Sequence, residues 1–205
     1  MPTAISIDLE TLKARYDAAI LSIGAAAIDL DTGKLGSTFY REITLASAMK
    51  AGNVSPDTLA WWVGQNDKAK RVFTNQGKKT PLPVALDELR VFILEHKGAT
   101  VWGNGSSFDI TILEYAYDHG CVGLSEPWSY WNIRDMRTIV DVAGVDKKDM
   151  PQVGVAHNAL DDAVFQAQVI HHCWVKIRSA LGMLKSKPAP AAVPQAAPAH
   201  DEDDL

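Results

Sequence analysis

The strongest constraint on the fold is a pair of acidic residues that ends an apolar run near the N-terminus. Residues 4–11 read Ala-Ile-Ser-Ile-Asp-Leu-Glu-Thr, so Asp8 and Glu10 are two positions apart. Alternate side chains of a β-strand project from the same face, and a strand here directs both carboxylates to one place. Two ionised carboxylates in a core need a cation, and hard divalent ions such as Mg²⁺ prefer carboxylate oxygen. The alternative is a strand end that carries two solvated acids.

Length and composition indicate one globular domain. The chain has 205 residues, of which 47% are hydrophobic and 22% are charged. Its apolar runs are too short to cross a membrane, and the first residues lack the basic start of a signal peptide. Cys121 and Cys173 are too few for a disulfide framework. We therefore expect a cytoplasmic protein with free thiols and no membrane contact.

The acidic charge is concentrated at the C-terminus. The net charge is −5, but four of the 25 acidic residues lie at 201–204, which leaves 21 acids against 20 Lys and Arg. A local basic groove is compatible with that balance. From residue 185, prolines alternate with alanines, as in an extended linker. We predict a folded domain over 1–184, and a disordered linker over 185–205 whose acidic tip serves solubility, docks a protein partner or competes with nucleic acid.

Hydrophobic periodicity predicts an α/β domain. Strands are expected at residues 4–8, 18–30, 37–43 and 99–103, with a turn at 31–34. Helices are expected from Ser55-Pro56, and at 67–74, 83–96, 108–119, 134–143 and 158–181. A fifth strand near residues 131–133 is left open.

A third candidate carboxylate, Asp109, follows the strand at 99–103. The run Trp102-Gly103-Asn104-Gly105-Ser106-Ser107-Phe108-Asp109 predicts a tight passage from strand to helix, with Asp109 in the first helical turn. The alternative is an acid that only complements the helix dipole. The Gly-x-Gly also suggests a dinucleotide-binding loop, but Phe108 replaces the third glycine and no clear βαβ unit precedes it.

The last helix opens with His157-Asn158-Ala159-Leu160-Asp161-Asp162. An Asp in its first turns can reach a metal held at a strand end, and a preceding His can reach a water on that metal. Neighbours on a helix point about 100° apart, so only one of the two acids faces the metal. The alternatives are a helix-start histidine without a role and acids that complement the dipole.

Together these motifs resemble the DEDD superfamily of 3′–5′ exonucleases, in the subtype with a catalytic histidine (DEDDh). In that subtype His precedes the last Asp by five residues, which selects Asp162; Asn158 excludes the sister subtype with Tyr. The motifs at residues 7–11, 61–62, 102–105, 108–109, 127–131 and 157–163 are similar to the exonuclease VIII-like group of phages and bacteria. The resemblance covers about residues 4–180. It implies a ribonuclease H-like fold, with a mixed five-stranded sheet and flanking helices.

The resemblance also implies a site with two Mg²⁺ or Mn²⁺ ions. Asp8 would bridge both ions, Glu10 and Asp162 would complete one of them, and Asp109 would help to hold the other. Two such ions can flank a phosphodiester, one activating water and one stabilising the leaving oxygen. Histidine titrates near neutral pH, which suits His157 to accept the proton of the water.

Residues around this site are candidates for substrate contacts. The resemblance suggests that Thr11 and Leu12 touch the terminal nucleotide, although Leu12 fits a strand-end turn equally well. Phe108 either stacks on a base or belongs to the core. Asn104, between the two glycines, is a further candidate.

Other side chains carry weaker signals. Trp61 and Trp62 point about 100° apart on one helix, so we expect one in the core and one along a groove. Four basic residues are candidates for phosphate contacts, or are simply solvated: Arg134, Arg137, Lys147 and Lys148. The run His171-His172-Cys173 does not converge on one zinc ion, because adjacent helix residues diverge.

We therefore predict a metal-dependent 3′–5′ exonuclease that acts on nucleic acid with a 3′ end, with single-stranded DNA favoured and RNA possible. The first alternative is an exoribonuclease that uses the same chemistry. The second is a nucleic-acid-binding module without catalysis, and the intact set of acids and histidine weighs against it.

Overall fold

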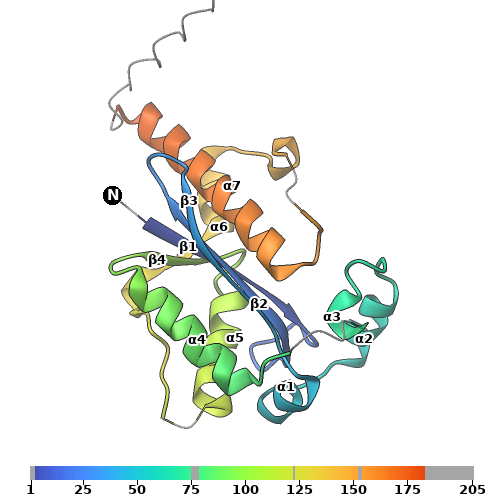
Figure 1. Cartoon of the computed structure of the whole chain (residues 1–205). Coiled ribbons are helices and arrows are strands. Elements are labelled where there is room, and N and C mark those ends of the chain that lie inside the picture. Colours follow the sequence, from blue (N-terminus) through green and yellow to red (C-terminus); the bar gives the residue numbers. More distant parts are fainter. Residues whose placement is uncertain (1–2, 75–78, 122, 152–153, 183–205) are drawn as a thin grey trace, which may run out of the picture.

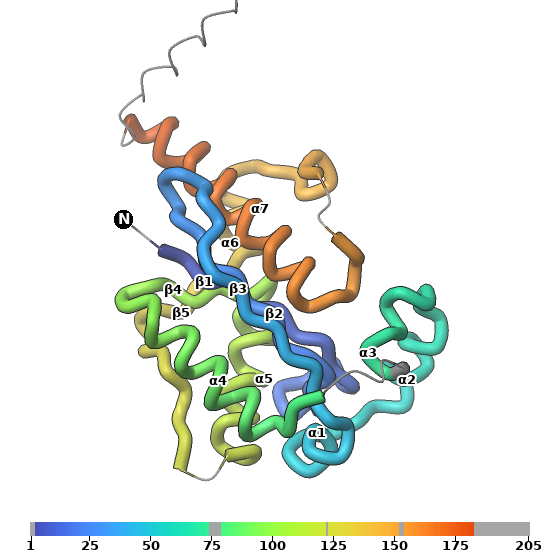
Figure 2. Tube along the Cα trace, viewed as in Figure 1, coloured from blue at the N-terminus to red at the C-terminus, as the bar shows by residue number. Residues whose placement is uncertain are grey.

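The protein is described by a computed structural model at residues 3–74, 79–121, 123–151 and 154–182. Five strands form one mixed sheet: β1 Thr3–Thr11, β2 Ile20–Asp29, β3 Leu35–Glu42, β4 Thr100–Gly103 and β5 Ile133–Asp135. Their order in the sheet is β3-β2-β1-β4-β5 (Figure 2). The first three strands are antiparallel, whereas β4 runs parallel to both β1 and β5. This confirms the predicted α/β class with a mixed five-stranded sheet.

Helices cover both faces of the sheet (Figure 1). They are α1 Leu45–Ala51, α2 Pro56–Val63, α3 Arg71–Thr74, α4 Leu82–Glu95, α5 Asp109–Gly120, α6 Met136–Ala143 and α7 Ala159–Ala180. Short 3₁₀ turns lie at Tyr130–Asn132 and Lys147–Asp149. One core cluster joins the sheet to α4 and α5, and a second joins it to α6 and α7. None of the helices in the described ranges has the length and hydropathy needed to cross a membrane.

Several element boundaries differ from the sequence prediction, each for a local reason. The helix predicted at 67–74 is reduced to α3, because Asn66 Oδ1 accepts hydrogen bonds from the amides of Lys68 and Ala69 and makes a turn. The fifth strand exists at Ile133–Asp135. As a result α6 begins at Met136 instead of 134, where Asp135 accepts a hydrogen bond from the amide of Thr138 and caps the helix.

Two further differences concern the start of the chain and a short helix. Strand β1 continues to Thr11, three residues beyond the prediction, because its pairing with β2 extends through Glu10 and Ser22. Helix α1 was not predicted; its seven residues are held by a tertiary contact, in which Ser47 Oγ accepts a hydrogen bond from the amide of Leu82. The predicted linker and acidic tail at 185–205 lie outside the described residues.

Alternation along β1 decides which face carries the acidic pair. Ile5, Ile7 and Leu9 pack into the core beneath α4 and α5. Residues of the other parity face α7, and both Ser6 and Asp8 hydrogen-bond to a residue of that helix. The acidic pair therefore lies on the α7 face, at the carboxyl end of β1.

Gly24 in β2 allows the start of α7 to approach this face. Its Cα lies opposite Asp8 in the sheet. A Cβ atom at position 24 would come within 2.1 Å of the carbonyl oxygen of Ala159, the first residue of α7. The missing side chain is thus what lets the first turn of α7 rest directly on the sheet beside Asp8.

We predict that Gly24→Ala destabilises the protein by about 1–3 kcal/mol, because the added methyl group must push backbone away from backbone. Urea denaturation of the purified variant measures this. Gly36→Ala in β3 is the matched control, since its Cβ would meet Ala27 at an ordinary 3.5 Å. Equal stability of the two variants would contradict the close approach of α7.

Candidate active site

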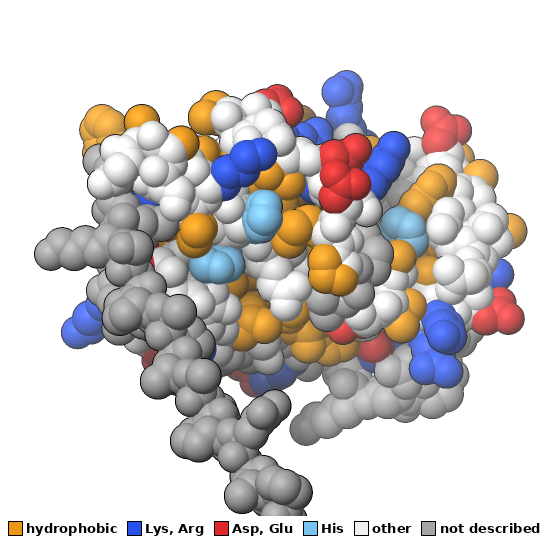
Figure 3. All heavy atoms as spheres, turned by 90° about the horizontal axis from the view of Figure 1, so that it is seen from above, with side chains coloured by type: hydrophobic (Ala, Val, Ile, Leu, Met, Phe, Trp, Pro, Cys, Tyr) orange, Lys and Arg blue, Asp and Glu red, His pale blue; other side chains and the backbone are white. Residues whose placement is uncertain are grey.

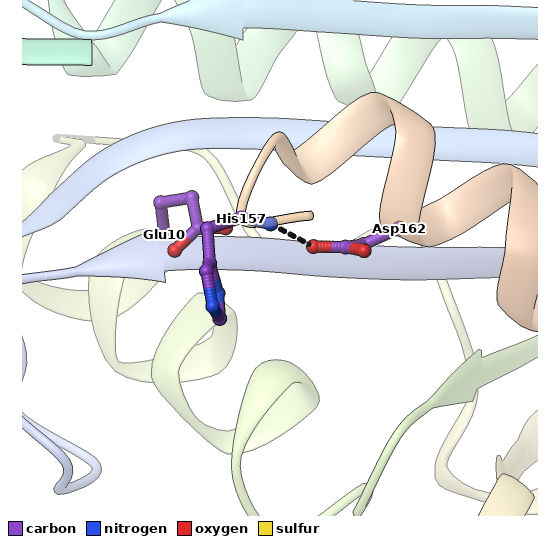
Figure 4. Close-up of side chains that lie close together, drawn as sticks. All are labelled: Glu10, His157 and Asp162. Carbon is purple, nitrogen blue, oxygen red and sulfur yellow. Dashed lines mark hydrogen bonds between the residues drawn. The ribbon is translucent and has the colours of Figure 1, made fainter. Parts of the chain in front are cut away.

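Three elements bring the predicted carboxylates to the carboxyl end of β1. Asp8 and Glu10 lie on β1, Asp109 is the first residue of α5, and Asp162 lies in the first turn of α7. Ligand atoms of Glu10, His157 and Asp162 lie within 4.8 Å of one another. In the view of Figure 4, His157 lies between the two carboxylates. Asp109 is close enough to raise the pKa values of Asp8 and Glu10.

Burial raises the pKa values of all four carboxyl groups, and repulsion by the other site carboxylates adds to it at Asp8 and Glu10. Burial raises the pKa of Asp8 well above its usual range, and the charges of Asp109, Glu10 and Asp162 add to it. Burial, with Asp162 and Asp109, raises the pKa of Glu10 to about 8. Burial also raises the pKa of Asp109 to about 7 and that of Asp162 above its ordinary value. Four such groups around one space match the oxygen-rich donor set that hard divalent ions require.

His157 has a strained backbone that the surrounding contacts maintain. Its φ angle of 63° is in the left-handed region, which is costly for a residue other than glycine. Its amide donates a 2.9 Å hydrogen bond to Asp162 Oδ2 (Figure 4). The ring of Trp61 meets the imidazole edge-on, with centroids 5.0 Å apart. Asn158 then caps α7, accepting hydrogen bonds from the amides of Leu160 and Asp161.

The two adjacent acids of α7 face different partners. Asp162 lies with Glu10 and His157, whereas Asp161 Oδ2 accepts a 2.8 Å hydrogen bond from the amide of Val155. Gly154 has a φ of 66° and no side chain, which leaves space for the Asp161 carboxylate. A Cβ atom at position 154 would lie 2.2 Å from Cγ of Asp161. Asp161 thus orders the loop before His157, and Asp162 is the acid placed for a metal.

Gln166 belongs to the site, although sequence reasoning did not identify it. Its Nε2 donates a 2.6 Å hydrogen bond to Asp8 Oδ1, and its Oε1 accepts a weaker one from Ser6 at 3.4 Å. Only 3% of Gln166 is exposed. The available signal was its position one turn after Asp162, as a polar residue on the inward face of the helix.

Two cavities meet at Glu10. The first, of about 380 Å³, is lined by Asp8, Glu10, Asp162, His157, Gln166, Asn104, Lys147 and four apolar residues. The second, of about 400 Å³, is mainly apolar and includes Thr11, Trp61 and Phe108. Asn104 Oδ1 is buried, and within the described part of the chain it has no hydrogen-bond partner. The first cavity therefore has an oxygen atom available for a ligand.

The tryptophan pair behaves as predicted. Trp62 is buried and its Nε1 donates a 2.9 Å hydrogen bond to the carbonyl of Thr11, while Trp61 is 45% exposed at the cavity. Phe108 both packs on the core and lines the apolar cavity. Leu12 is 2% exposed and packs in the core, which favours its structural interpretation over contact with a nucleotide.

Two of the four predicted basic residues lie near the site. Lys147 lines the first cavity. The Arg137 guanidinium lies beside Gly105, and a Cβ atom at position 105 would lie 3.2 Å from its Cζ. The positive charge of Arg137 also lowers the pKa of Asp109 and so partly offsets the effect of burial. Arg134 and Lys148 are on the surface. Seen from above, acidic and basic side chains are interspersed, as the nearly balanced charge implies (Figure 3).

Comparison with known proteins identifies a family. Residues 3–174 match the model described as the 3′–5′ exoribonuclease Rv2179c-like domain. No curated protein sequence matches the chain significantly.

Solved nuclease structures share the fold. Escherichia coli exonuclease I in complex with a dT13 oligonucleotide has a TM-score of 0.58 and 13% identity, over 89% of this chain and 43% of that chain. The nuclease domain of 3′hExo, a DEDDh family member bound to rAMP, has a TM-score of 0.51 and 13% identity, over 89% of this chain and 94% of that chain. S. pombe Pop2p in its Mg²⁺- and Mn²⁺-bound form has a TM-score of 0.52 and 15% identity, over 88% of this chain and 84% of that chain.

These likenesses establish the fold, and they confirm the expected ribonuclease H-like architecture. Some of the matched proteins are longer: the chain spans 65% of cell-death related nuclease 4 and 43% of exonuclease I.

The repulsion within the site predicts a stability that falls as pH rises when no metal is bound. Carboxyl groups with raised pKa values bind more protons in the native state than in the unfolded state. The free energy of unfolding should therefore decrease between about pH 5 and pH 8. Urea denaturation in EDTA across this range measures the slope.

Matched variants test the source of that slope. Glu10→Gln removes the group whose pKa is raised to about 8 and should flatten the upper part of the range. Glu95→Gln, at the exposed end of α4, should keep the wild-type slope. A wild-type stability that is constant or rises from pH 5 to pH 8 would contradict the site's electrostatics.

Proposed function

The chain belongs to the family of Rv2179c-like 3′–5′ exoribonuclease domains, and we propose that it is a 3′–5′ exonuclease that uses two Mg²⁺ or Mn²⁺ ions. The observation that carries the proposal is one cavity lined by Asp8, Glu10, Asp162 and His157, with the buried carboxylate of Asp109 close enough to raise the pKa of Asp8. Pop2p, a protein of the same fold, is known in a form with Mg²⁺ and Mn²⁺. The narrower resemblance to the exonuclease VIII-like group stays a prediction.

The carboxylates would hold the ions as expected from the resemblance, with Asp8 between them, Glu10 and Asp162 on one and Asp109 on the other. Bound divalent ions would activate water and neutralise charge on the phosphate and the departing oxygen. Gln166 fixes the orientation of Asp8 through the 2.6 Å hydrogen bond. His157 is the group that we assign to accept the proton of the attacking water, because its ring stands beside Glu10 and Asp162.

The apolar cavity is suited to the base of the terminal nucleotide. It adjoins the acidic cavity at Glu10, and Trp61 and Phe108 offer aromatic surface. Aromatic stacking tolerates any base, which suits an enzyme that removes successive nucleotides. Thr11 lines the same cavity, and we assign to it a contact with the terminal nucleotide.

RNA is the first substrate that we propose, because the family description names an exoribonuclease. The DEDDh nuclease domain bound to rAMP is consistent with this choice. Single-stranded DNA, favoured from the sequence, is the second candidate, supported by the exonuclease I complex with dT13.

Digestion of matched, 5′-labelled single- and double-stranded RNA and DNA tests the proposal. With Mg²⁺ or Mn²⁺ we expect stepwise shortening from the 3′ end, and none in EDTA. Asp8→Ala should nearly abolish shortening while nucleic-acid binding largely survives, since Asp8 is the ligand assigned to both ions. Near-normal activity of folded Asp8→Ala would refute the two-metal site, and binding without hydrolysis by wild type would favour the non-catalytic alternative.

The adjacent acids of α7 give a matched pair of variants. Asp162→Asn should lower kcat by at least about 100-fold, the scale on which single catalytic groups act. Asp161→Asn should keep most activity, because the amide oxygen of Asn can still accept the hydrogen bond from Val155. Single-turnover rates of the two proteins at saturating metal measure the difference, and the reverse order would mean that Asp161 is the ligand.

A further inference from the structure

The geometry of phosphodiester hydrolysis gives the direction in which the substrate strand leaves the site; this step rests on the proposed function. In an in-line displacement, the attacking water and the departing 3′ oxygen lie on opposite sides of phosphorus. His157, the assigned base, lies on the β2–β3 side of β1, where it lines a third cavity with Ser22 and Tyr40. The departing oxygen, and the strand that carries it, must therefore lie on the β4–β5 side.

Two arginines follow the β4–β5 side away from the acidic cavity. Arg137, on the exposed surface of α6, places its guanidinium beside Gly105 in the loop after β4. Arg134 is exposed on the edge strand β5, and its Nη1 donates hydrogen bonds to the carbonyls of Trp131 and Ile133 at 2.7 and 2.8 Å. The first arginine thus lies next to the site, and the second lies farther along the sheet edge.

An exposed aromatic pair lies directly beyond Arg134. Tyr130 and Trp131 are each 72% exposed, with ring centroids 4.9 Å apart and planes tilted by 32°. Their neighbour Trp128 is buried, and its Nε1 donates a hydrogen bond to Glu114, which anchors the segment. Trp128 is therefore part of the core, whereas Tyr130 and Trp131 are exposed next to each other. A contiguous exposed patch of large aromatic side chains is typical of a binding surface.

We propose that Arg137, Arg134, Tyr130 and Trp131 form a second nucleic-acid contact surface, which holds the 5′ part of the strand that stays after each cleavage. Arginines would contact phosphates, and the rings would stack on unpaired bases. The two positive charges complement a polyanion, whereas a symmetric contact between two copies of the chain would bring the same positive charges together.

The register of the sheet gives the reach of this surface. Arg134 pairs with Trp102, which pairs with Ser6, two residues before Asp8. Two strand spacings and two residues place the Cα atoms of Arg134 and Asp8 about 12 Å apart. Each nucleotide advances a stacked strand by about 3.4 Å. A dinucleotide has only one nucleotide beyond the cleaved phosphate and falls short of the aromatic pair, whereas an oligonucleotide of 12 residues is long enough to reach it.

Substrate length provides the test. Wild type should show a lower KM for rU12 or dT12 than for the corresponding dinucleotide. Trp131→Ala and Arg134→Ala should each raise the KM for the 12-mer about tenfold, within the range for base stacking, with kcat unchanged and the loss confined to the long substrate. Arg90→Ala, which removes a cation from α4 on the opposite face, is the control and should behave as wild type.

Several outcomes would overturn the inference. These are a wild-type KM independent of length, equal losses on both substrates, or variants that lose a dimer in gel filtration and nothing else. Binding of a 5′-fluorescein 12-mer in EDTA, followed by anisotropy, does not depend on hydrolysis. If wild type hydrolyses nothing, the proposed function fails; weaker 12-mer binding by Trp131→Ala would then still support the surface, and unchanged binding would reject it.

Discussion

The candidate site depends on holding four carboxylates together at the carboxyl end of β1 against the cost of their burial and the repulsion among them at Asp8 and Glu10. Burial raises their pKa values, so the metal-free arrangement costs free energy that the rest of the fold must supply. This free energy comes from the core on the other face of β1, where Ile5, Ile7 and Leu9 pack beneath α4 and α5. One strand thus has a stabilising face and a functional face, and the alternation of its side chains separates them.

Helix α7 determines the geometry on the functional face. Gly24 lets its first turn touch the sheet, which brings Asp162 to Glu10 and Gln166 to Asp8. The loop before the helix is held by Asp161, and its last residue, His157, keeps a left-handed backbone. The candidate metal ligands therefore come from a strand and two helices, and His157 from a loop that other side chains hold in place. Such fixed positions are what preorganised sites require.

Local periodicity predicted part of this arrangement, and the resemblance to DEDDh exonucleases predicted the rest. Alternation in a strand placed Asp8 and Glu10 together, and the angle between helix neighbours meant that only one of Asp161 and Asp162 faces the site. The spacing from His157 in the resembled subtype then selected Asp162. Sequence reasoning missed what tertiary contacts decide: the bond from Gln166 to Asp8, the burial of Leu12, and helix α1. The short edge strand β5 was left open because three residues carry little periodicity. The narrower family group stays a prediction, because the matching family model is a different one and the solved structures share only the fold.

The left-handed backbone of His157 changes how mutagenesis at this position should be read. Alanine, the usual replacement, removes the imidazole. It keeps a Cβ atom, which disfavours a positive φ, and it lacks a polar side chain that could stabilise that conformation. A loss of activity in His157→Ala would therefore have two causes. One is the missing imidazole, and the other is a relaxed loop in which the amide of residue 157 no longer donates its hydrogen bond to Asp162. Asparagine tolerates that conformation far better and keeps a side chain of similar size. Kinetic differences between the two replacements separate the contribution of the ring from that of the backbone that presents it.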